Sequence, residues 1–449
     1  MERIENLFEK FAEFLWGDWL LAALIGVGLL YTVMTGFVQF KQIPFIVREV
    51  FLQPILELKE KKKSTSLTIT SFQALCTSVG SIVGSGNIVG VSTAILSGGP
   101  GALFWMWVAA VVGMATKYGE IVLGLHYHTK DRLGRVMGGP MYYIEKGLSC
   151  RWLGVVAAIL LFAQNLGGTL IQSNTIANVM RNRFWVSEWI TGIILALIMS
   201  AIAAGGLKRL AKVAVRIVPF MALLYVSGGL IVIVVNAAKI TDVFMSIIEG
   251  AFSLKAGIGG VAGFSLKEAM RYGVSRGLYS NEAGEGSAAV IHSTVAVDHP
   301  VRQAVYGIVD VFIDTIIICS ITGFVILLTG VHNIVVNPSL LTSTAFGTVA
   351  PWMSVIVSVS LMLFAGTSLM SQWYFGHVSL LYLANEDVAW VYRILFPAAI
   401  AVGSVSSIKL VWLIQDCALG LLIIPNLIAL TILSPEVRRL SNDFFKKAA

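Results

Sequence analysis

The sequence has little charge and few cysteines, and its first twenty residues lack the pattern of a secretory leader. Only 13% of its 449 residues are Asp, Glu, Lys or Arg, which excludes a soluble multidomain protein. Its four cysteines, Cys76, Cys150, Cys319 and Cys417, lie too far apart to form a closely spaced metal or redox motif. The N-terminal segment lacks the basic start and cleavage site of a signal peptide, so we expect the first apolar segment to remain as a helix.

The sequence instead contains long apolar segments. Hydrophobic residues make up 57% of the chain and the mean hydropathy is +0.82, so most of it must lie in lipid or in a membrane-embedded core. We therefore predict an all-α integral membrane protein with eleven transmembrane helices and the lipid bilayer as its environment. The predicted spans are residues 16–36, 68–97, 101–127, 153–179, 186–206, 213–236, 268–293, 302–330, 351–383, 389–407 and 411–433.

The net charge of +7 does not indicate nucleic acid, because the basic residues cluster in alternate loops. By the positive-inside rule these loops are cytoplasmic, which places the N-terminus outside the cell membrane and the C-terminus inside. The loop residues are Lys41, Arg48, Lys59, Lys61, Lys62, Lys63, Lys130, Arg132, Arg135, Lys146, Arg151, Lys208, Arg209, Lys212 and Arg216, and the tail adds Arg438, Arg439, Lys446 and Lys447.

A glycine-rich segment interrupts the second predicted span. Four glycines and Asn87 occur between Gly80 and Gly90. Backbone groups in hydrocarbon must be paired, so such a segment is tolerated only where it faces protein, ions or a water-filled cavity. Interrupted spans at matching positions of two halves are typical of the binding site of a secondary transporter.

A related segment occurs around Asn281. With Asn87 aligned to Asn281, both segments fit the pattern N-x-[VA]-G-x-[SG]-[ST]-A, and each leads to a proline, Pro100 or Pro300. Five spans follow from residue 68 and five from residue 268. Because five is an odd number, the second copy enters the membrane from the opposite side and has opposite polarity. This predicts a five-plus-five inverted repeat with broken first and sixth core helices. The alternative is that small residues merely allow close helix packing.

These features divide the chain into four parts. Residues 1–66 are predicted to hold the extracellular N-terminus, the first transmembrane helix and a basic cytoplasmic linker. The two five-helix repeats are expected at 67–240 and 255–433, followed by a cytoplasmic tail at 434–449.

Three segments resemble a known family. Gly98–Gly113, with Phe104-Trp105-Met106-Trp107 inside it, is similar throughout to the alanine or glycine:cation symporter family, as are Gly138–Ile144 and Gly277–Gly286. The resemblance covers nearly the whole chain after residue 60. It implies uptake of alanine or glycine with a cation, usually sodium, without a cofactor, and the inverted fold of the bacterial leucine transporter.

The resemblance to that fold also implies a sodium site. Gly84-Ser85-Gly86-Asn87 matches the break of its first core helix, and Thr367-Ser368 matches a pair in its eighth. The implied ligands are the carbonyls of Gly80, Val83 and Phe364 and the hydroxyls of Thr367 and Ser368. The acidic pair Glu282 and Glu285 departs from that pattern and leaves a second sodium site in doubt.

An amino acid zwitterion suits the two ends of a broken helix. We expect its carboxylate at the N–H groups of Ser85, Gly86 and Asn87, beside Gly84, and its ammonium or the sodium ion at carbonyls near Ser78 to Ser81. Thr169 and Gln172, in a span that also holds Gln164 and Asn165, contact the substrate or form interhelical hydrogen bonds. The second break adds Tyr279, Ser280 and Asn281. Candidate bulky walls of the pocket are Trp105, Trp107, Phe162, Phe364, Met370 and Trp373.

Charged residues inside spans are functional candidates, since isolated charge at membrane depth costs several kcal/mol. We expect Lys117 and Glu120 to form a structural pair near the cytoplasmic end, while Asp310 and Asp314 share a helix face. Glu282 and Glu285 either pair with Arg276 or carry a coupling proton, and the short sequence separation favours pairing.

The predicted function is sodium-coupled import of alanine and glycine by alternating access. The alternative is a proton-coupled symporter of small amino acids that uses Glu282 or Glu285. A channel is disfavoured because one chain holds its own pseudo-symmetric partner. An intramembrane enzyme is disfavoured because the sequence shows no cluster of nucleophile, base or metal ligands.

Overall fold

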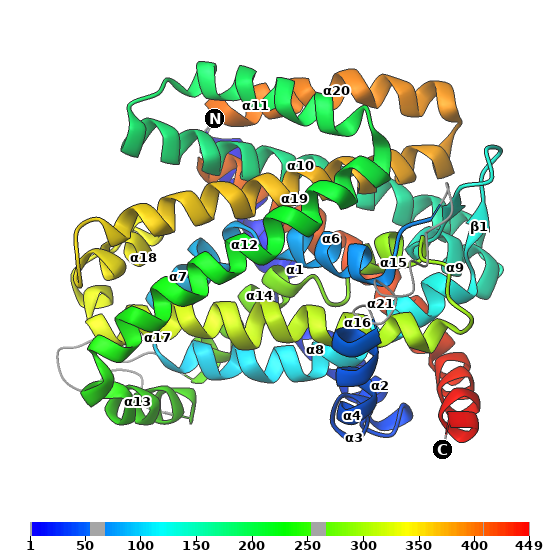
Figure 1. The fold of residues 1–449 in the computed structure, drawn as a ribbon, viewed down its shortest axis with the longest axis horizontal. Helices are drawn as coiled ribbons and strands as arrows, with labels where there is room; N and C mark the ends of the chain where they lie inside the picture. The colour runs from blue at the N-terminus through cyan, green and yellow to red at the C-terminus, as the bar shows by residue number, and fades with distance from the viewer. Residues whose placement is uncertain (1, 54–67, 253–265, 407, 449) are drawn as a thin grey trace.

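The computed structural model describes residues 2–53, 68–252, 266–406 and 408–448, and this part of the chain is almost entirely helical. Long helices run roughly parallel and antiparallel across the molecule (Figure 1). The N-terminal part contains α1 (Glu2–Leu15), α2 (Asp18–Met34), α3 (Val38–Lys41), α4 (Ile43–Val47) and the π-helical η1 (Arg48–Leu52).

The next part carries the first broken helix and four elongated helices. It contains α6 (Ser71–Ile82), η2 (Ser85–Asn87), α7 (Val89–Gly98), α8 (Gly101–His126), the hairpin of β1 (Thr129–Lys130) and β2 (Val136–Met137), α9 (Pro140–Gly147), α10 (Arg151–Phe184), α11 (Glu188–Ala203), α12 (Gly206–Val235), η3 (Ala237–Lys239) and α13 (Ile240–Phe252).

The last part also has a broken helix followed by long helices. It contains α14 (Leu266–Asn281), α15 (Ser287–His292), α16 (Pro300–Val311), the π-helical η4 (Phe312–Cys319), α17 (Ser320–Thr329), η5 (Val331–Asn333), α18 (Pro338–Gly347), α19 (Met353–Leu383), α20 (Glu386–Val405) and α21 (Ile408–Ala448).

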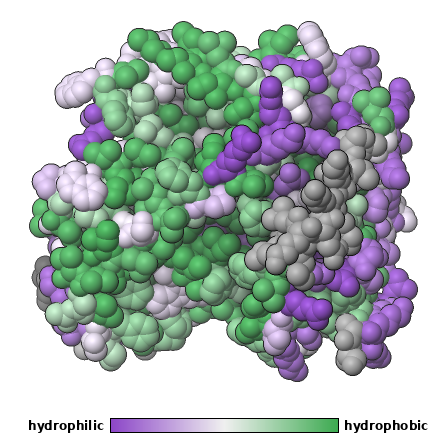
Figure 2. Space-filling view, viewed as in Figure 1, coloured by the Kyte–Doolittle hydropathy of each residue, from purple (hydrophilic) through white to green (hydrophobic). Residues whose placement is uncertain are grey.

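Seven helices of the described chain are long and apolar enough to cross a membrane, or nine if the bent pairs α1/α2 and α6/α7 each count as one span. These nine correspond to nine of the eleven predicted spans. The predicted span 186–206 is α11, which has only 16 residues, whereas about 20 cross a bilayer upright. The predicted span 268–293 is the charged pair α14 and α15. Apolar side chains cover much of the surface in Figure 2.

The predicted C-terminal tail is helical, because α21 continues through residues 434–448. Two contacts with α8 hold this extension: Tyr118 Oη lies 2.7 Å from Ser441 Oγ, and His126 Nε2 lies 3.2 Å from Glu436 Oε1. The short helices α9, α13 and α18 lie between the predicted spans and were not anticipated from the sequence.

The first helix break lies within the segment expected from the sequence. A capping box at Thr70 and Gln73 starts α6, and the helix ends at Ile82 because Val83 adopts an extended ψ of 96°. The chain then bends by 58° into η2 and α7. Pro100 caps α8, as its position after the glycine-rich segment predicted.

The second break follows Asn281 and uses left-handed backbone at three positions. Glu282 has φ 55°, and Gly284 and Gly286 have φ 98° and 81°. Glycine adopts this region without strain, whereas a side chain rarely does. The chain resumes as α15, and Pro300 opens α16.

The two breaks lie against each other in the interior. A Cβ atom at Gly86 would come within 3.3 Å of Ser280 Cα and of the Tyr279 ring. The segments outside the breaks also meet, because Ile69, before α6, and Val295, after α15, form a parallel backbone bridge. The interrupted backbone therefore faces protein and polar side chains.

Candidate functional site

Oxygen atoms from α6 and α19 gather where α6 ends. Ser368 Oγ lies 2.8 Å from the carbonyl oxygen of Ser81 and 3.4 Å from those of Gly80 and Val83. The last carbonyls of a helix have no intrahelical N–H partner, so they are free to accept from other groups. The end of α6 thus offers several carbonyls to one hydroxyl of α19.

Thr367 adds a second hydroxyl beside this cluster. Its Oγ1 lies 3.0 Å from the carbonyl oxygen of Phe364, and a Cβ atom at Gly80 would lie 3.2 Å from Thr367 Cβ. Neutral hydroxyl and carbonyl oxygens suit a hard cation. The residues predicted as sodium ligands, Gly80, Val83, Phe364, Thr367 and Ser368, therefore lie close together.

A small polar cavity, with about 20 Å³ open to the centre of a water-sized sphere, lies beside the oxygen cluster, between both breaks and α10, α19 and α21. Among the described residues of its lining, Ile82 has the only aliphatic side chain. The lining residues are Ser81, Ile82, Gly84, Gly86, Gln164, Gly168, Gln172, Tyr279, Glu282, Glu285, Gln372 and Gln415.

Four of the predicted substrate-binding residues line this cavity. They are Gly84, Gly86, Gln172 and Tyr279. Gln172 Oε1 accepts a hydrogen bond from the backbone N–H of Ser85 at 3.4 Å. A Cβ atom at Gly84 would lie 2.8 Å from Ser368 Oγ and 2.9 Å from Gln172 Nε2, so glycine here lets the cavity and the oxygen cluster adjoin.

Asn87, Ser280 and Asn281 contact one buried turn of η4 instead. Asp314 accepts hydrogen bonds from Asn87 Nδ2 at 2.6 Å, Ser280 Oγ at 2.9 Å and Thr315 Oγ1 at 2.8 Å. Asn281 Nδ2 donates to Thr315 Oγ1 at 3.2 Å. The two asparagines of the repeated motif thus attach both breaks to the same segment.

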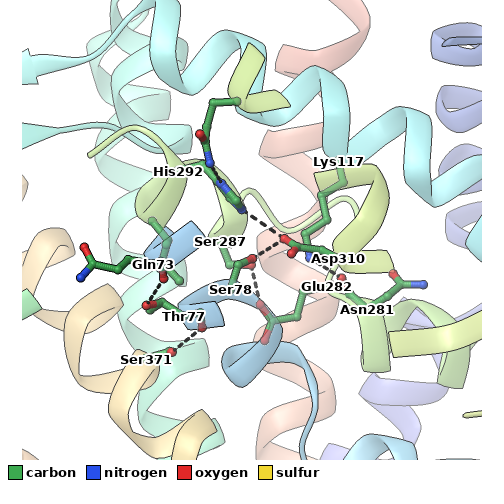
Figure 3. Close-up of polar contacts among 12 residues, drawn as sticks. Gln73, Thr77, Ser78, Lys117, Asn281, Glu282, Ser287, His292, Asp310 and Ser371 are labelled. Atoms are coloured by element: carbon green, nitrogen blue, oxygen red, sulfur yellow. Dashed lines mark hydrogen bonds and ion pairs between the residues drawn. The ribbon is translucent and has the colours of Figure 1, made fainter. Parts of the chain in front are cut away.

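Ser78, on α6, belongs to a second buried network (Figure 3). This network is centred on Asp310, which lies one helical turn before Asp314. Its Oγ donates to Asp310 Oδ2 at 2.5 Å, and His292 Nε2 lies 3.1 Å from that oxygen. Gln303 Nε2 lies 2.8 Å from His292 Nδ1. This network joins α6, α15 and α16. Asp310 and Asp314, one helical turn apart, therefore each contact segments from both helix breaks.

Lys117 and Glu120 hold the backbone of the second break. Lys117 Nζ donates to the carbonyl oxygen of Asn281 at 2.8 Å, and Glu120 Oε1 accepts from the N–H groups of Gly284 and Gly286 at 3.0 Å each. Both side chains are fully buried. The two residues are electrostatic neighbours, as expected, but each forms its hydrogen bonds with interrupted backbone in the interior.

Glu282 and Glu285 lie at the cavity and are bonded by neutral groups. Ser287 Oγ donates to Glu282 Oε2 at 2.6 Å (Figure 3). Ser81 Oγ lies 3.5 Å from Glu282 Oε1. Gln164 Nε2 donates to Glu285 Oε2 at 3.4 Å.

The expected pairing of these glutamates with Arg276 is wrong. Arg276 lies on α14 and forms an ion pair with Asp416 of α21, at 3.3 Å from Nη1 to Oδ1. The guanidinium also lies 5.8 Å from the centre of the Trp412 ring, which contacts Tyr279 at 5.3 Å between ring centres. The glutamates instead have Ser287, Ser81 and Gln164 as partners.

Other candidates occupy different places. Thr169 donates to the carbonyl oxygen of Asn165 within its own helix, at 2.8 Å. The bulky candidates Trp105, Trp107, Phe162, Phe364, Met370 and Trp373 are not in the described lining of the cavity.

Two glutamines of the lining were missed from the sequence. Gln372 lies one helical turn after Ser368, and this spacing could have placed it on the same face. Gln415, on α21, gave no such signal because nothing in its neighbourhood marked the site.

Comparisons with known proteins identify the family of the chain. Residues 1–449 match the model of the sodium:alanine symporter family. The chain is 38% identical to the sodium/alanine symporter AgcS of Methanococcus maripaludis, over 96% of this chain and 95% of that protein. It is 36% identical to the putative sodium/proton-dependent alanine carrier protein YrbD of Bacillus subtilis, over 96% and 90% of the two chains.

A likeness to solved structures concerns the fold alone. The structure of MhsT in complex with L-phenylalanine covers 84% of this chain and 99% of its own, with a TM-score of 0.57 and 12% sequence identity. The broken helices therefore occur in a fold that is known among transporters.

Proposed function

Because the chain belongs to the sodium:alanine symporter family, we propose that it imports alanine and glycine together with sodium ions by alternating access. Transport of an amino acid with a cation is what the family shares. The choice of alanine and glycine, the sodium ligands and the mechanism are the proposal.

The observation that carries the proposal is the contact of Ser368 with the end of α6. Its Oγ lies within 3.4 Å of three backbone carbonyls at the break. A sodium ion bound by Gly80, Val83, Phe364, Thr367 and Ser368 would replace these hydroxyl contacts and hold α6 against α19. No carboxylate takes part, so a bound monovalent cation leaves the cluster with a single positive charge.

The adjoining cavity is proposed to bind the amino acid. The N–H groups of Ser85 and Gly86 begin η2 and suit a carboxylate. The ammonium group would lie toward the Ser81 carbonyl and the Glu282 and Glu285 carboxylates. A leucine side chain would meet glutamine and glutamate side chains in this lining, which disfavours large apolar substrates.

The coupling is proposed to pass through Gly84. A Cβ atom at this position would lie within 3 Å of both the Ser368 hydroxyl and the Gln172 amide, so both side chains pack against this glycine. A cation that orders the end of α6 therefore also orders the N–H groups that face the substrate. Binding of one ligand would favour binding of the other, as linkage requires.

The proposed membrane arrangement has eleven spans. Two of them could not stand alone in lipid, because α11 is too short and the broken α14/α15 is too charged. Both are flanked by longer helices, and α14 contacts α8 closely at Gly273 and Gly277. The two sets of five spans would form the inverted repeat, with the N-terminus outside and the C-terminus in the cytoplasm.

One experiment tests the function directly. Purified protein in liposomes would be given labelled alanine, glycine, serine or leucine under an imposed sodium gradient or an imposed proton gradient. We expect a sodium gradient to drive uptake of alanine and glycine and not of leucine. Uptake that is the same with and without sodium would refute the proposal.

A proton-coupled symporter remains the second candidate. Glu282 and Glu285 are both buried at the cavity and receive hydrogen bonds from neutral side chains. A proton could be carried by such a carboxylate. Under this alternative, a proton gradient without sodium would drive alanine uptake in the same liposomes.

A further inference from the structure

One wall of the cavity at the helix breaks is formed by two glutamines that pack against α10. A Cβ atom at Gly168 would lie 2.9 Å from Cδ and Nε2 of Gln372, and one at Gly167 would overlap Oε1 of Gln415. Both glutamines are buried, at 4% and 2% exposure, and both line the cavity together with Gly168. Two neighbouring glycines of one helix therefore hold two side-chain amides at the same wall, which we call the amide wall.

The other two glutamines of the lining are engaged where the charged groups of an amino acid are expected. Gln172 accepts a hydrogen bond from the backbone N–H of Ser85 at 3.4 Å, and Gln164 donates to Glu285 at 3.4 Å. The side chains of the amide wall, by contrast, form no hydrogen bond within the part of the chain that the structure describes. They are therefore the lining amides that remain for the side chain of the substrate.

The lining offers little apolar surface to a substrate side chain. Among its described residues, Ile82 has the only aliphatic side chain. An amide supplies both N–H donors and a carbonyl acceptor, so it can bind a hydroxyl group in either direction. A buried hydroxyl needs such a partner, whereas a methyl group gains nothing from one. A site that offers hydrogen bonds therefore disfavours an analogue of the same size that lacks the hydroxyl.

We propose that serine is a substrate of this cavity, bound with its hydroxyl at the amide wall of Gln372 and Gln415. The inference rests on the proposed function, which assigns the carboxylate and ammonium groups of the amino acid to the other sides of the cavity. Serine has one oxygen atom more than alanine, so a site for alanine needs little extra room. On entry, the hydroxyl exchanges its hydrogen bonds to water for hydrogen bonds to the two amides.

The test compares serine with 2-aminobutyrate, which has nearly the same size and carries a methyl group in place of the hydroxyl. Labelled serine and labelled alanine are bound to the purified full-length protein in detergent with sodium, and binding is measured by scintillation proximity. Unlabelled serine or 2-aminobutyrate is then added as the competitor. We expect serine to displace either label at a concentration about tenfold lower than 2-aminobutyrate, the effect of one additional hydrogen bond.

The wild type alone can overturn the proposal, so the test does not depend on a variant that folds. If labelled alanine binds and 2-aminobutyrate competes as well as serine, the amide wall does not select a hydroxyl and the proposal is wrong. If labelled serine binds and labelled alanine does not, the substrate choice of the proposed function fails while this inference stands.

The variants Gln372→Leu and Gln415→Leu test the position of the hydroxyl. Leucine is close to glutamine in size and removes the amide, so the preference for serine over 2-aminobutyrate should be lost or reversed. Gln42→Leu is the matched control, because Gln42 lies between α3 and α4 and does not line the cavity. The position is refuted if both variants of the amide wall keep the preference of the wild type, or if Gln42→Leu loses as much.

Discussion

Lys117 Nζ lies 2.8 Å from the carbonyl oxygen of Asn281, at the residue where α14 stops. The negative end of the helix dipole lies at this carbonyl, so an ammonium group is favoured there. On the next turn of α8, Glu120 binds the N–H groups of Gly284 and Gly286. One helix therefore satisfies both the donors and the acceptors that the second break leaves open.

Replacing Lys117 with methionine should destabilise the protein. The change removes a charge-assisted hydrogen bond, which contributes about 1.5–3 kcal/mol, and leaves Glu120 without a nearby cation. The measurement is the unfolding temperature in detergent, with Lys130→Met in the exposed hairpin as the control. Equal unfolding temperatures for the two variants would show that Lys117 does not stabilise the break.

The double variant Thr367→Ala with Ser368→Ala should weaken sodium activation of alanine uptake. Both hydroxyls contact carbonyls at the oxygen cluster proposed to bind sodium, and alanine leaves the cavity lining unchanged. The sodium concentration for half-maximal uptake should rise about tenfold or more, since losing one ligand oxygen costs over 1 kcal/mol. Ser379→Ala, whose hydroxyl bonds within the same helix, is the control. Unchanged sodium activation would refute the assignment.

Gly84→Ala should impair both sodium activation and alanine binding. The added Cβ atom would lie 2.8 Å from Ser368 Oγ and 2.9 Å from Gln172 Nε2, so both side chains must move. Gly90→Ala is the matched control, because its Cβ atom would meet nothing within 4 Å. Binding is measured by scintillation proximity with labelled alanine. Normal alanine affinity in Gly84→Ala would contradict the proposed coupling.

Glu282→Gln and Glu285→Gln separate sodium coupling from proton coupling. If sodium alone drives transport, uptake under a sodium gradient should persist in at least one of these variants, because the amides keep the shape of the cavity. If a carboxylate carries the proton, one variant should abolish uptake driven by a proton gradient and retain alanine exchange. Exchange of internal for external alanine is the readout.

The pH dependence of stability should include a contribution from His299, just before α16. Burial lowers its pKa below the ordinary value of 6.5, outweighing Asp298, which acts in the opposite direction. A lowered histidine pKa means that the folded state favours the neutral ring. Its contribution is therefore present above pH 6.5 and lost as the pH falls through the lowered pKa.

The neutral ring of His299 accepts a hydrogen bond from the N–H of Val301 at 3.2 Å, as a helix cap. Asn also caps helices but does not titrate in this range, so His299→Asn is the comparison. The unfolding temperature of the wild type should fall more between pH 7 and 5 than that of His299→Asn. Parallel curves would exclude this role of His299.

The fold could be anticipated from the sequence as far as apolar length and helix breaks determine it. Nine predicted spans correspond to long helices or bent pairs, and both breaks occur within the expected segments. The short helices α9, α13 and α18 could not be predicted, because segments of this length form through contacts with the rest of the bundle.

The site was less predictable because its charges bind groups distant in the chain. Arg276 pairs with Asp416, which lies 140 residues away, although Glu282 is near in sequence. Helical periodicity placed Asp310 and Asp314 on one face, yet it could not indicate that each serves a different network. The glycines could be assigned to a break, whereas the contacts of Ser368 depend on how α19 packs.

The parallel bridge between Ile69 and Val295 makes the two half-helices α6 and α15 mechanically dependent. The helix α6 begins just after Ile69, and α15 ends just before Val295. The Ser78–Asp310–His292 network connects the same two helices further into the bundle. A swing of α6 away from the bundle must either break that bridge or carry α15 with it. The two half-helices would then move together, and a disulfide across the bridge should prevent their separation.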